Sequence, residues 1–283
     1  MDPRQSQLKT KDGLTLLVRT WYPAVPNGTL LAILHGIGEH GGRYEHVAQY
    51  FISMGFTVSA LDQRGHGKSG GRRVYTKHYD DLISDVDLWF DDLHSQLKPS
   101  QIYLLGHSLG GLLSVKYTIE KRPAIYGLIL SGPAVKINED MNPFLQSVSG
   151  IVGRLFPRLK TVRLDASLLS RDDQVVKAYL EDPLVYHEGI PARFGYLVLQ
   201  ATHDVERSLS SLKCPLLVLH GSADKLVYPD ASWSLISNCG SHDKTIHVFE
   251  GLYHEILNEP EKTLVLETIT EWLRQRSGSS KPI

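Results

Sequence analysis

The stretch that decides the fold is Gln101-Ile-Tyr-Leu-Leu-Gly-His-Ser-Leu-Gly-Gly111. Residues 101–105 are mostly apolar, which predicts a buried strand, and the helical pattern of residues 109–121 stops before Pro123. Between them lies the G-x-S-x-G sequence, residues 106–110. In a strand-to-helix turn of this kind, glycines allow close backbone approach, and the serine is presented at the carboxyl edge of a sheet. This setting predicts Ser108 as a nucleophile.

The rest of the chain alternates between strand and helix patterns on both sides of this turn. Continuous apolar runs such as 29–35 suit strands that are buried on both faces of a parallel sheet. The alternation predicts an α/β fold, in which a mostly parallel sheet is flanked by helices. The expected strands are 14–21, 29–35, 56–61, 101–105, 126–130, 215–220 and 245–249, and the expected helices are 44–54, 79–97, 109–121, 230–238 and 261–274.

Residues 135–207 interrupt this alternation. They contain no clear buried strand and carry helical segments separated by Pro, Gly and Asp. We interpret them as a helical cap (lid) inserted above the sheet, so that residues 1–134 and 208–283 form the core domain.

One cap segment, residues 142–156, has an unusual distribution of side chains. Its apolar residues fall on one helix face (144, 145, 148, 151, 152, 155 and 156), and no formal charge lies between Met141 and Gly153. A solvated helix face normally carries charges. The segment is therefore either a helix packed between cap and core, or a mobile lid whose uncharged face contacts acyl chains or a membrane surface.

A serine hydroxyl needs a base, and the base needs an orienting acid. In a G-x-S-x-G fold of this kind the chain order is serine, acid, histidine. Asp224 follows the expected strand 215–220, and His254 follows the expected strand 245–249, so both lie in loops past a strand's carboxyl end. We therefore predict Asp224 as the acid and His254 as the base, with Asp204 as the nearest alternative acid. His107 is expected to pack or hydrogen-bond beneath the nucleophile.

Acyl transfer also requires donors for the oxyanion of the tetrahedral intermediate. The backbone N–H of Leu109, which follows the nucleophile, is one candidate. The second is the N–H of Ile37 in His35-Gly-Ile-Gly-Glu-His40, since the flanking glycines let the backbone turn toward the site. The reaction would pass through an acyl-enzyme on Ser108, and neither a metal nor an organic cofactor is required.

A second glycine-rich stretch, residues 62–71, invites comparison with a phosphate-binding loop. Gly67-Lys68-Ser69 fits the end of G-x-x-x-x-G-K-[ST], but Asp62 stands where the first glycine should be. We interpret the stretch as a structural loop after a strand.

Composition narrows the class further. The chain of 283 residues has 30 Lys plus Arg against 31 Asp plus Glu, so it lacks the basic surface of a nucleic-acid-binding protein. Its two cysteines, Cys214 and Cys239, form no CxxC or Cys/His pattern, which argues against a disulfide framework or a zinc site. The first residues are polar and the longest aliphatic runs are short. We therefore expect a cytoplasmic protein that touches membranes, if at all, peripherally through apolar surface of the cap.

With these residues identified, the sequence resembles the monoglyceride lipase and lysophospholipase-like branch of the α/β-hydrolase serine hydrolases. The block H-G-x-G-E-H-x-x-R-Y at residues 35–44 is the most particular match. Further shared segments are 62–69, 106–111, 169–171, 182–184, 221–224 and 253–254.

The resemblance implies roles for individual residues. Ser108, Asp224 and His254 would be the triad, Ile37 and Leu109 the oxyanion hole, and Glu39 and Arg43 part of the polar floor that receives a glycerol head. The cap would line an apolar acyl tunnel. Animal members carry a second histidine three residues after the catalytic one, where this chain has Leu257, and this departure concerns head-group preference.

The expected activity is hydrolysis of a single-chain lipid ester, monoacylglycerol in the first place, to fatty acid and alcohol. The alternative is a broader carboxylesterase or lysophospholipase with the same chemistry, because fold and triad do not fix the leaving group. A non-enzymatic binding scaffold is the hypothesis from another class, and the complete set of triad residues argues against it.

Overall fold

The computed structural model describes residues 2–136 and 143–276. Within them, eight strands form one sheet in the order β1-β2-β4-β3-β5-β6-β7-β8. β1 and β2 are antiparallel to their neighbours, and all remaining pairings are parallel. The strands are β1 (Arg4–Lys9), β2 (Thr15–Trp21), β3 (Thr29–Leu34), β4 (Thr57–Leu61), β5 (Gln101–His107), β6 (Gly127–Ser131), β7 (Leu216–Gly221) and β8 (Lys244–Phe249).

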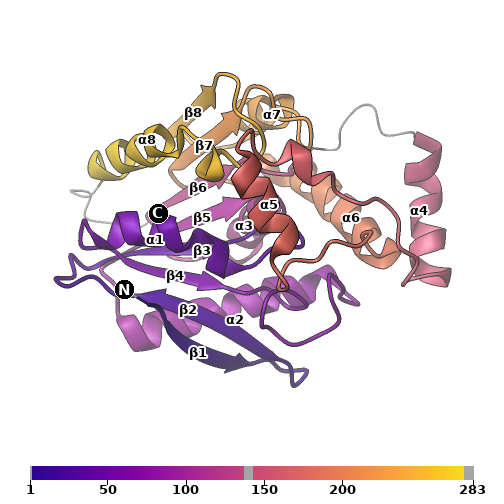
Figure 1. Ribbon diagram of the computed structural model, residues 1–283, viewed down its shortest axis with the longest axis horizontal. Helices are drawn as coiled ribbons and strands as arrows, with labels where there is room; N and C mark the ends of the chain where they lie inside the picture. Colours follow the sequence, from indigo (N-terminus) through magenta and orange to yellow (C-terminus); the bar gives the residue numbers. More distant parts are fainter. Residues whose placement is uncertain (1, 137–142, 277–283) are drawn as a thin grey trace.

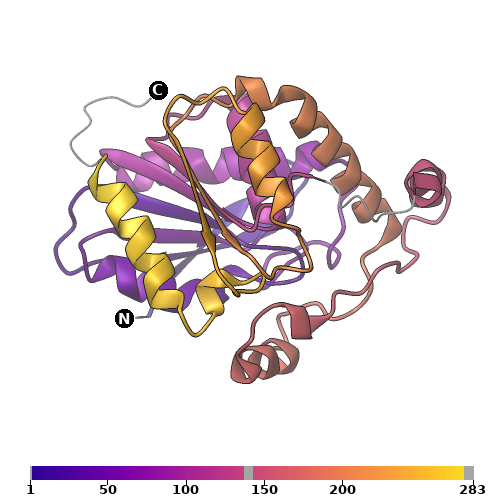
Figure 2. The ribbon, with the colours of Figure 1, turned by 90° about the horizontal axis from the view of Figure 1, so that it is seen from above.

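Two layers of helices cover the two faces of this sheet (Figures 1 and 2). Side chains of β3 alternate between the faces, as a pleated strand requires: Leu30 and Leu34 enter one core, and Leu31 and Ile33 enter the other. The first core is closed by α2 (Tyr79–Leu97), α3 (Leu109–Lys121) and α7 (Asp230–Asn238), and the second by α1 (Glu45–Ile52) and α8 (Lys262–Arg274). The predicted mostly parallel α/β fold is confirmed.

One strand, β1, was not expected from the sequence. Its residues are polar and exposed except Leu8, which pairs with Leu16 of β2. β1 is an edge strand with one apolar contact, so its hydrogen bonds to β2 define it and no periodic pattern announces it.

The segment between β6 and β7 carries three helices, α4 (Pro143–Leu155), α5 (Asp173–Glu181) and α6 (Ala192–Ser208). Figures 1 and 2 place α4 at the periphery, beyond α6 as seen from the sheet. α6 contributes Phe194, Leu197 and Val205 to the same hydrophobic core as β3 and α3. The division into core and cap at residues 134/135 and 207/208 remains a prediction.

α4 approaches α6 through its two glycines. Gly150 and Gly153 lie against Tyr196 of α6, where an added Cβ would come within 3.1 and 3.0 Å of the tyrosine. Ile151 and Leu155, from the apolar side, are 62% and 65% exposed. Of the two interpretations of this segment, burial between cap and core does not hold for Ile151 and Leu155, because the glycines permit the closer approach. Asn142, the expected first residue of the helix, lies outside the described residues.

Candidate active site

Ser108 occupies a strained turn between β5 and α3. Its backbone angles, φ 52° and ψ −116°, are unusual for a residue with a side chain. The two glycines of the motif are sterically required. A Cβ at Gly106 would lie 2.5 Å from the carbonyl oxygen of Gly110, and a Cβ at Gly110 would lie 2.6 Å from the carbonyl carbon of Leu34. The turn therefore holds Ser108 at the N-terminus of α3, where the helix dipole favours negative charge.

His254 and Asp224 form a short hydrogen-bonded pair. The Nδ1 of His254 donates to Oδ2 of Asp224 at 2.6 Å. Oδ1 of Asp224 accepts from the N–H groups of Leu226 at 2.8 Å and Val227 at 3.0 Å, which fixes the carboxylate. His220 Nε2 donates to Oδ2 at 3.1 Å, a second partner that the sequence did not suggest.

Ionisation follows this geometry. Burial opposes the charge on Asp224, but His254 and the hydrogen bond from His220 outweigh it and hold the pKa of Asp224 below its ordinary value. Burial lowers the pKa of His254, and the attraction of Asp224, helped by Glu255 and Glu39, raises it above its ordinary value. The pair can therefore carry an imidazolium next to a carboxylate.

A cavity of about 170 Å³ collects the predicted residues. Ser108, Asp224 and His254 follow β5, β7 and β8, and the carboxyl ends of parallel strands meet at one edge of a sheet. Ser108 and His254 line the cavity directly, whereas Asp224 lies behind His254. The wall is completed by Gly36, Ile37, Glu39, His107, Leu109, Ala134, Leu164, Leu169, Tyr179, Ile190, Val198, Leu226, Val227 and Glu255.

The two expected oxyanion donors both line this cavity. Gly36 passes so near the nucleophile that a Cβ on it would lie 3.3 Å from the Cβ of Ser108. Among the described residues, the N–H groups of Ile37 and Leu109 donate to no protein acceptor. Two donors without a protein partner beside a nucleophile, one on buried Leu109 and one on half-buried Ile37, suit a developing oxyanion.

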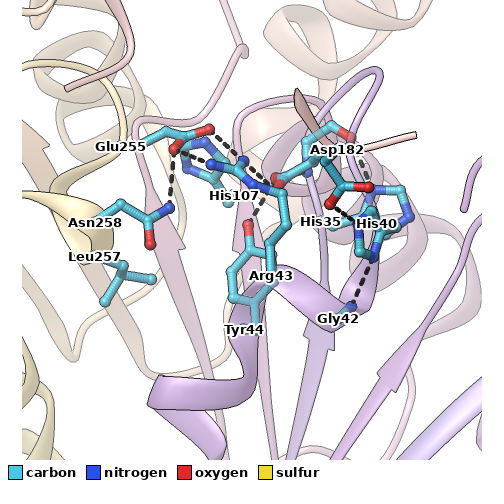
Figure 3. A network of polar contacts seen from close by, with 12 residues as sticks. His35, His40, Gly42, Arg43, Tyr44, His107, Asp182, Glu255, Leu257 and Asn258 are labelled. Atoms are coloured by element: carbon cyan, nitrogen blue, oxygen red, sulfur yellow. Dashed lines mark hydrogen bonds and ion pairs between the residues drawn. The ribbon is translucent and has the colours of Figure 1, made fainter. Parts of the chain in front are cut away.

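Glu39 and Arg43 belong to a largely buried ionic cluster with Glu255. Figure 3 shows Arg43 and Glu255 of this cluster, with the contacts between them as dashed lines. Arg43 makes a bidentate contact with Glu255 at 2.6 and 2.7 Å and a single contact with Glu39 at 2.8 Å. Glu39 and Glu255 line the cavity, and Arg43 is absent from the described lining. Glu255 was missed by the sequence reasoning. The sequence offered one sign of its role, its position directly after His254. Adjacency to a candidate base does not show that the side chain is buried.

Leu257 lies away from the cavity lining. Its side chain is buried in the core on the α1 and α8 face, and its carbonyl accepts a hydrogen bond from His46 at 2.7 Å. At the position where animal members carry a second histidine, this chain therefore has a buried core residue.

A larger cavity of about 450 Å³ adjoins the first. The two share Ile37, Leu164, Tyr179 and Ile190, so the larger cavity continues the smaller one toward the cap. Its remaining lining comes mainly from residues 163–167, α5 and residues 186–188.

Three other predictions can be placed. Asp204, the alternative acid, lies half-exposed on α6 and pairs with Lys116 and Arg207. His107 makes a hydrogen bond near the nucleophile, as expected: its Nδ1 lies 3.0 Å from the carbonyl oxygen of Ser131. The loop 62–71 is organised by buried Asp62, whose carboxylate accepts from the N–H groups of Gly41 and Lys68. This is a structural loop, as predicted.

No helix in the described parts of the chain is long and apolar enough to cross a membrane.

A mostly parallel sheet with a serine on a strained strand-to-helix turn defines a serine hydrolase of the α/β-hydrolase fold. The family model described as Hydrolase_4, serine aminopeptidase, S33, matches residues 26–261, and the chain belongs to this family.

Similar proteins agree with this assignment. A monoacylglycerol lipase of Mycolicibacterium smegmatis is 36% identical over 92% of this chain and 93% of its own length. Human monoglyceride lipase is 34% identical over 96% of this chain and 91% of its own length. The crystal structure of the Paleococcus ferrophilus monoacylglycerol lipase matches with a TM-score of 0.82 and 32% identity, covering 98% of this chain and 100% of that one.

Proposed function

We propose that this protein hydrolyses carboxylic esters of single-chain lipids, and monoacylglycerol in particular, to a fatty acid and an alcohol. The observation that carries the proposal is the His254–Asp224 pair beside Ser108 in a cavity whose other walls are largely aliphatic. The relatives named monoacylglycerol lipase support the same substrate class.

In the proposed mechanism, Oγ of Ser108 attacks the ester carbonyl and its proton passes to Nε2 of His254. Asp224 holds the imidazole by Nδ1 and stabilises the imidazolium that forms. The N–H groups of Ile37 and Leu109 receive the oxyanion, and removing one such donor typically costs about 10²- to 10³-fold in kcat. The imidazolium then protonates the departing alcohol, which leaves an acyl-enzyme on Ser108. Water, deprotonated by His254, attacks the acyl-enzyme and releases the fatty acid.

The polar end of the cavity suits the hydroxyl groups of a glycerol head. An ionised carboxylate offers about four acceptor positions. Glu39 uses three of them, for Gly36 N–H, Tyr44 O–H and Arg43. Glu255 uses three as well, two for Arg43 and one for Asn258. Each carboxylate therefore keeps a site for a hydroxyl donor.

We also propose peripheral membrane contact through the cap. Five large apolar residues within one short stretch are more than half exposed: Ile151, Leu155, Phe156, Leu159 and Val162. Arg154, Arg158, Lys160 and Arg163 lie in the same stretch, as expected for a surface that meets anionic lipid. Replacing Ile151 and Leu155 by serine should reduce co-sedimentation with anionic vesicles and leave hydrolysis of a short soluble ester unchanged. Unchanged co-sedimentation would contradict this docking surface.

The activity is tested by fatty-acid release from 1-monooleoylglycerol and from oleoyl-lysophosphatidylcholine, with Ser108→Ala as the blank. A strong preference for the glyceride supports the proposed substrate class. Comparable rates would make the protein a broader esterase or lysophospholipase. A folded wild-type protein that fails to react with a fluorophosphonate would contradict the assignment of Ser108 and revive the binding-scaffold hypothesis.

A further inference from the structure

Arg43 joins the two loops that supply the groups around Ser108. We define the oxyanion loop as residues 35–40 and the histidine loop as residues 250–259. Within the first, Glu39 accepts the N–H of Gly36 at 2.6 Å, one residue before the donor Ile37. Within the second, Glu255 directly follows His254. Arg43 contacts both carboxylates, so one guanidinium spans from the oxyanion donor to the base.

We propose that Arg43 and Glu255 form a positioning pair that keeps the oxyanion loop and the histidine loop in register, and that Arg43 does so without contacting the substrate. This inference rests on the proposed roles of Ile37 and His254. It assigns Glu255 a function that lies outside the triad and changes the expected role of Arg43 from head-group contact to loop positioning.

The surroundings of Arg43 leave little access for a ligand. Its side chain is 11% exposed, and the ring of Tyr179 from α5 covers the guanidinium at 4.8 Å. Both of its carboxylate partners line the cavity, and Arg43 is outside the described lining. A planar fork with three charge-assisted hydrogen bonds in fixed directions is suited to holding two loops at one spacing.

The histidine loop has a second attachment at the same residue. The N–H of Glu255 donates to the carbonyl oxygen of Leu169 at 2.8 Å, and its carboxylate accepts from Asn258 at 2.8 Å. The main chain and the side chain of Glu255 are both fixed, so His254, the residue before it, is held in a defined position. A displacement of about 1 Å in a catalytic group can cost about 10²-fold in rate.

Charge gives the pair a second effect on His254. The charged and titratable groups around this imidazole are Asp224, Glu255, Glu39 and the ring of His107, whose centroid is 4.8 Å away. Burial lowers the pKa of His254, while Asp224, Glu255 and Glu39 raise it. Neutralising Glu255 removes one of these carboxylates and also leaves less negative charge around Arg43 to balance its positive charge. Both changes lower the pKa of His254.

The test compares two esters with the same acyl group, p-nitrophenyl butyrate and monobutyrin. Only the second has a glycerol head. Arg43→Lys keeps the charge but cannot contact both carboxylates in a fork, and Glu255→Gln keeps the shape but removes the charge. We expect each variant to lose about 10- to 100-fold in kcat/KM on both esters, with little change in KM for p-nitrophenyl butyrate. Fluorophosphonate labelling of Ser108 should slow by a similar factor.

Two further measurements separate positioning from a loss of folding. Glu255→Gln should move the acid limb of the kcat/KM profile to lower pH, which a purely structural lesion would not do. The double variant should lose no more activity than the less active of the two single variants, because both changes break one unit. Arg64→Lys is the matched control: Arg64 is also buried and bidentate, but its partners are Asp85 on α2 and Asp12, which do not line the cavity, so activity should persist.

The outcomes distinguish this inference from the proposed function. A loss confined to monobutyrin would show that Arg43 serves the glycerol head, and the positioning role would be wrong. Full activity of both folded variants on both esters would equally overturn it. Failure of wild-type Ser108 to label would instead contradict the proposed triad itself.

Discussion

Gly221 ends β7, and its missing side chain makes room for the histidine loop. A Cβ at this position would lie 2.6 Å from the carbonyl carbon of Leu252 and closer still to the carbonyl oxygens of Leu252 and Tyr253. Ordinary contacts of a Cβ begin near 3.4 Å. Gly221→Ala must therefore push this backbone away by about 1 Å, because packed interiors do not absorb such overlap. The next residue along the displaced segment is His254.

The displacement predicts two measurable losses. Overpacking of this kind costs about 1–3 kcal/mol of stability, which urea denaturation measures. Moving the base by about 1 Å should lower kcat by about 10²-fold, which hydrolysis of p-nitrophenyl butyrate measures at pH values above the pKa of His254. The catalytic loss should exceed what the unfolded fraction explains, so activity is normalised to folded protein.

A matched control separates the steric argument from any general effect of glycine replacement. Gly195 lies within α6, and a Cβ there would meet its nearest atom at 3.8 Å. Gly195→Ala should leave kcat unchanged and stabilise the protein by up to about 1 kcal/mol, the helix preference of alanine. Wild-type kcat in a folded Gly221→Ala variant would refute the reasoning, since it would mean that the histidine loop yields without moving His254.

Three other predictions concern ionisation and the triad. Asp224→Asn should lower kcat by about 10⁴-fold, measured on any ester substrate, because an amide nitrogen would face His254 Nδ1 and favour the wrong tautomer. Since the pKa of His254 is raised and the base must be neutral, kcat/KM should rise with pH through a midpoint above 6.5, and a midpoint below that value would contradict the pairing with Asp224. Burial raises the pKa of Glu39, but Arg43 and neighbouring histidines lower it to about 2 from 4.5. The stability that this carboxylate contributes is complete above pH 4.5 and is lost as pH falls toward 2, so urea midpoints should fall over that range and fall less steeply in Glu39→Gln.

The strand–turn–helix around Ser108 could be predicted because its signals are local. An apolar strand, two glycines and a helix pattern lie within one short stretch, and each acts on its immediate neighbours. The loops of Asp224 and His254 could be placed for a related reason: each follows a strand, and parallel strands deliver their carboxyl ends to one edge.

The orientation of α4 and the pairing of Glu255 could not be predicted in this way. Which face of α4 is buried depends on Tyr196 filling the space beside Gly150 and Gly153, a contact between distant parts of the chain. Arg43 and Glu255 are 212 residues apart. An acidic residue in a loop normally predicts solvent exposure, and only the folded arrangement shows that Glu255 is buried against a guanidinium.

The distribution of charge around Ser108 bears on the choice of leaving group. Glu39, Arg43 and Glu255 together carry one net negative charge, and Asp224 adds another on the far side of His254. The proposed oxyanion donors, the N–H groups of Ile37 and Leu109, line the same cavity beside Ser108 at the N-terminus of α3. The site therefore offers carboxylates for the imidazolium and N–H donors for the oxyanion of the proposed tetrahedral intermediate. An anionic leaving group would be repelled by Glu39 and Glu255, and solvent screens this repulsion weakly because both carboxylates are buried. A neutral polyol would meet acceptors for its hydroxyls instead, so we expect the same carboxylates to favour a glyceride over a lipid ester whose leaving alcohol carries a phosphate.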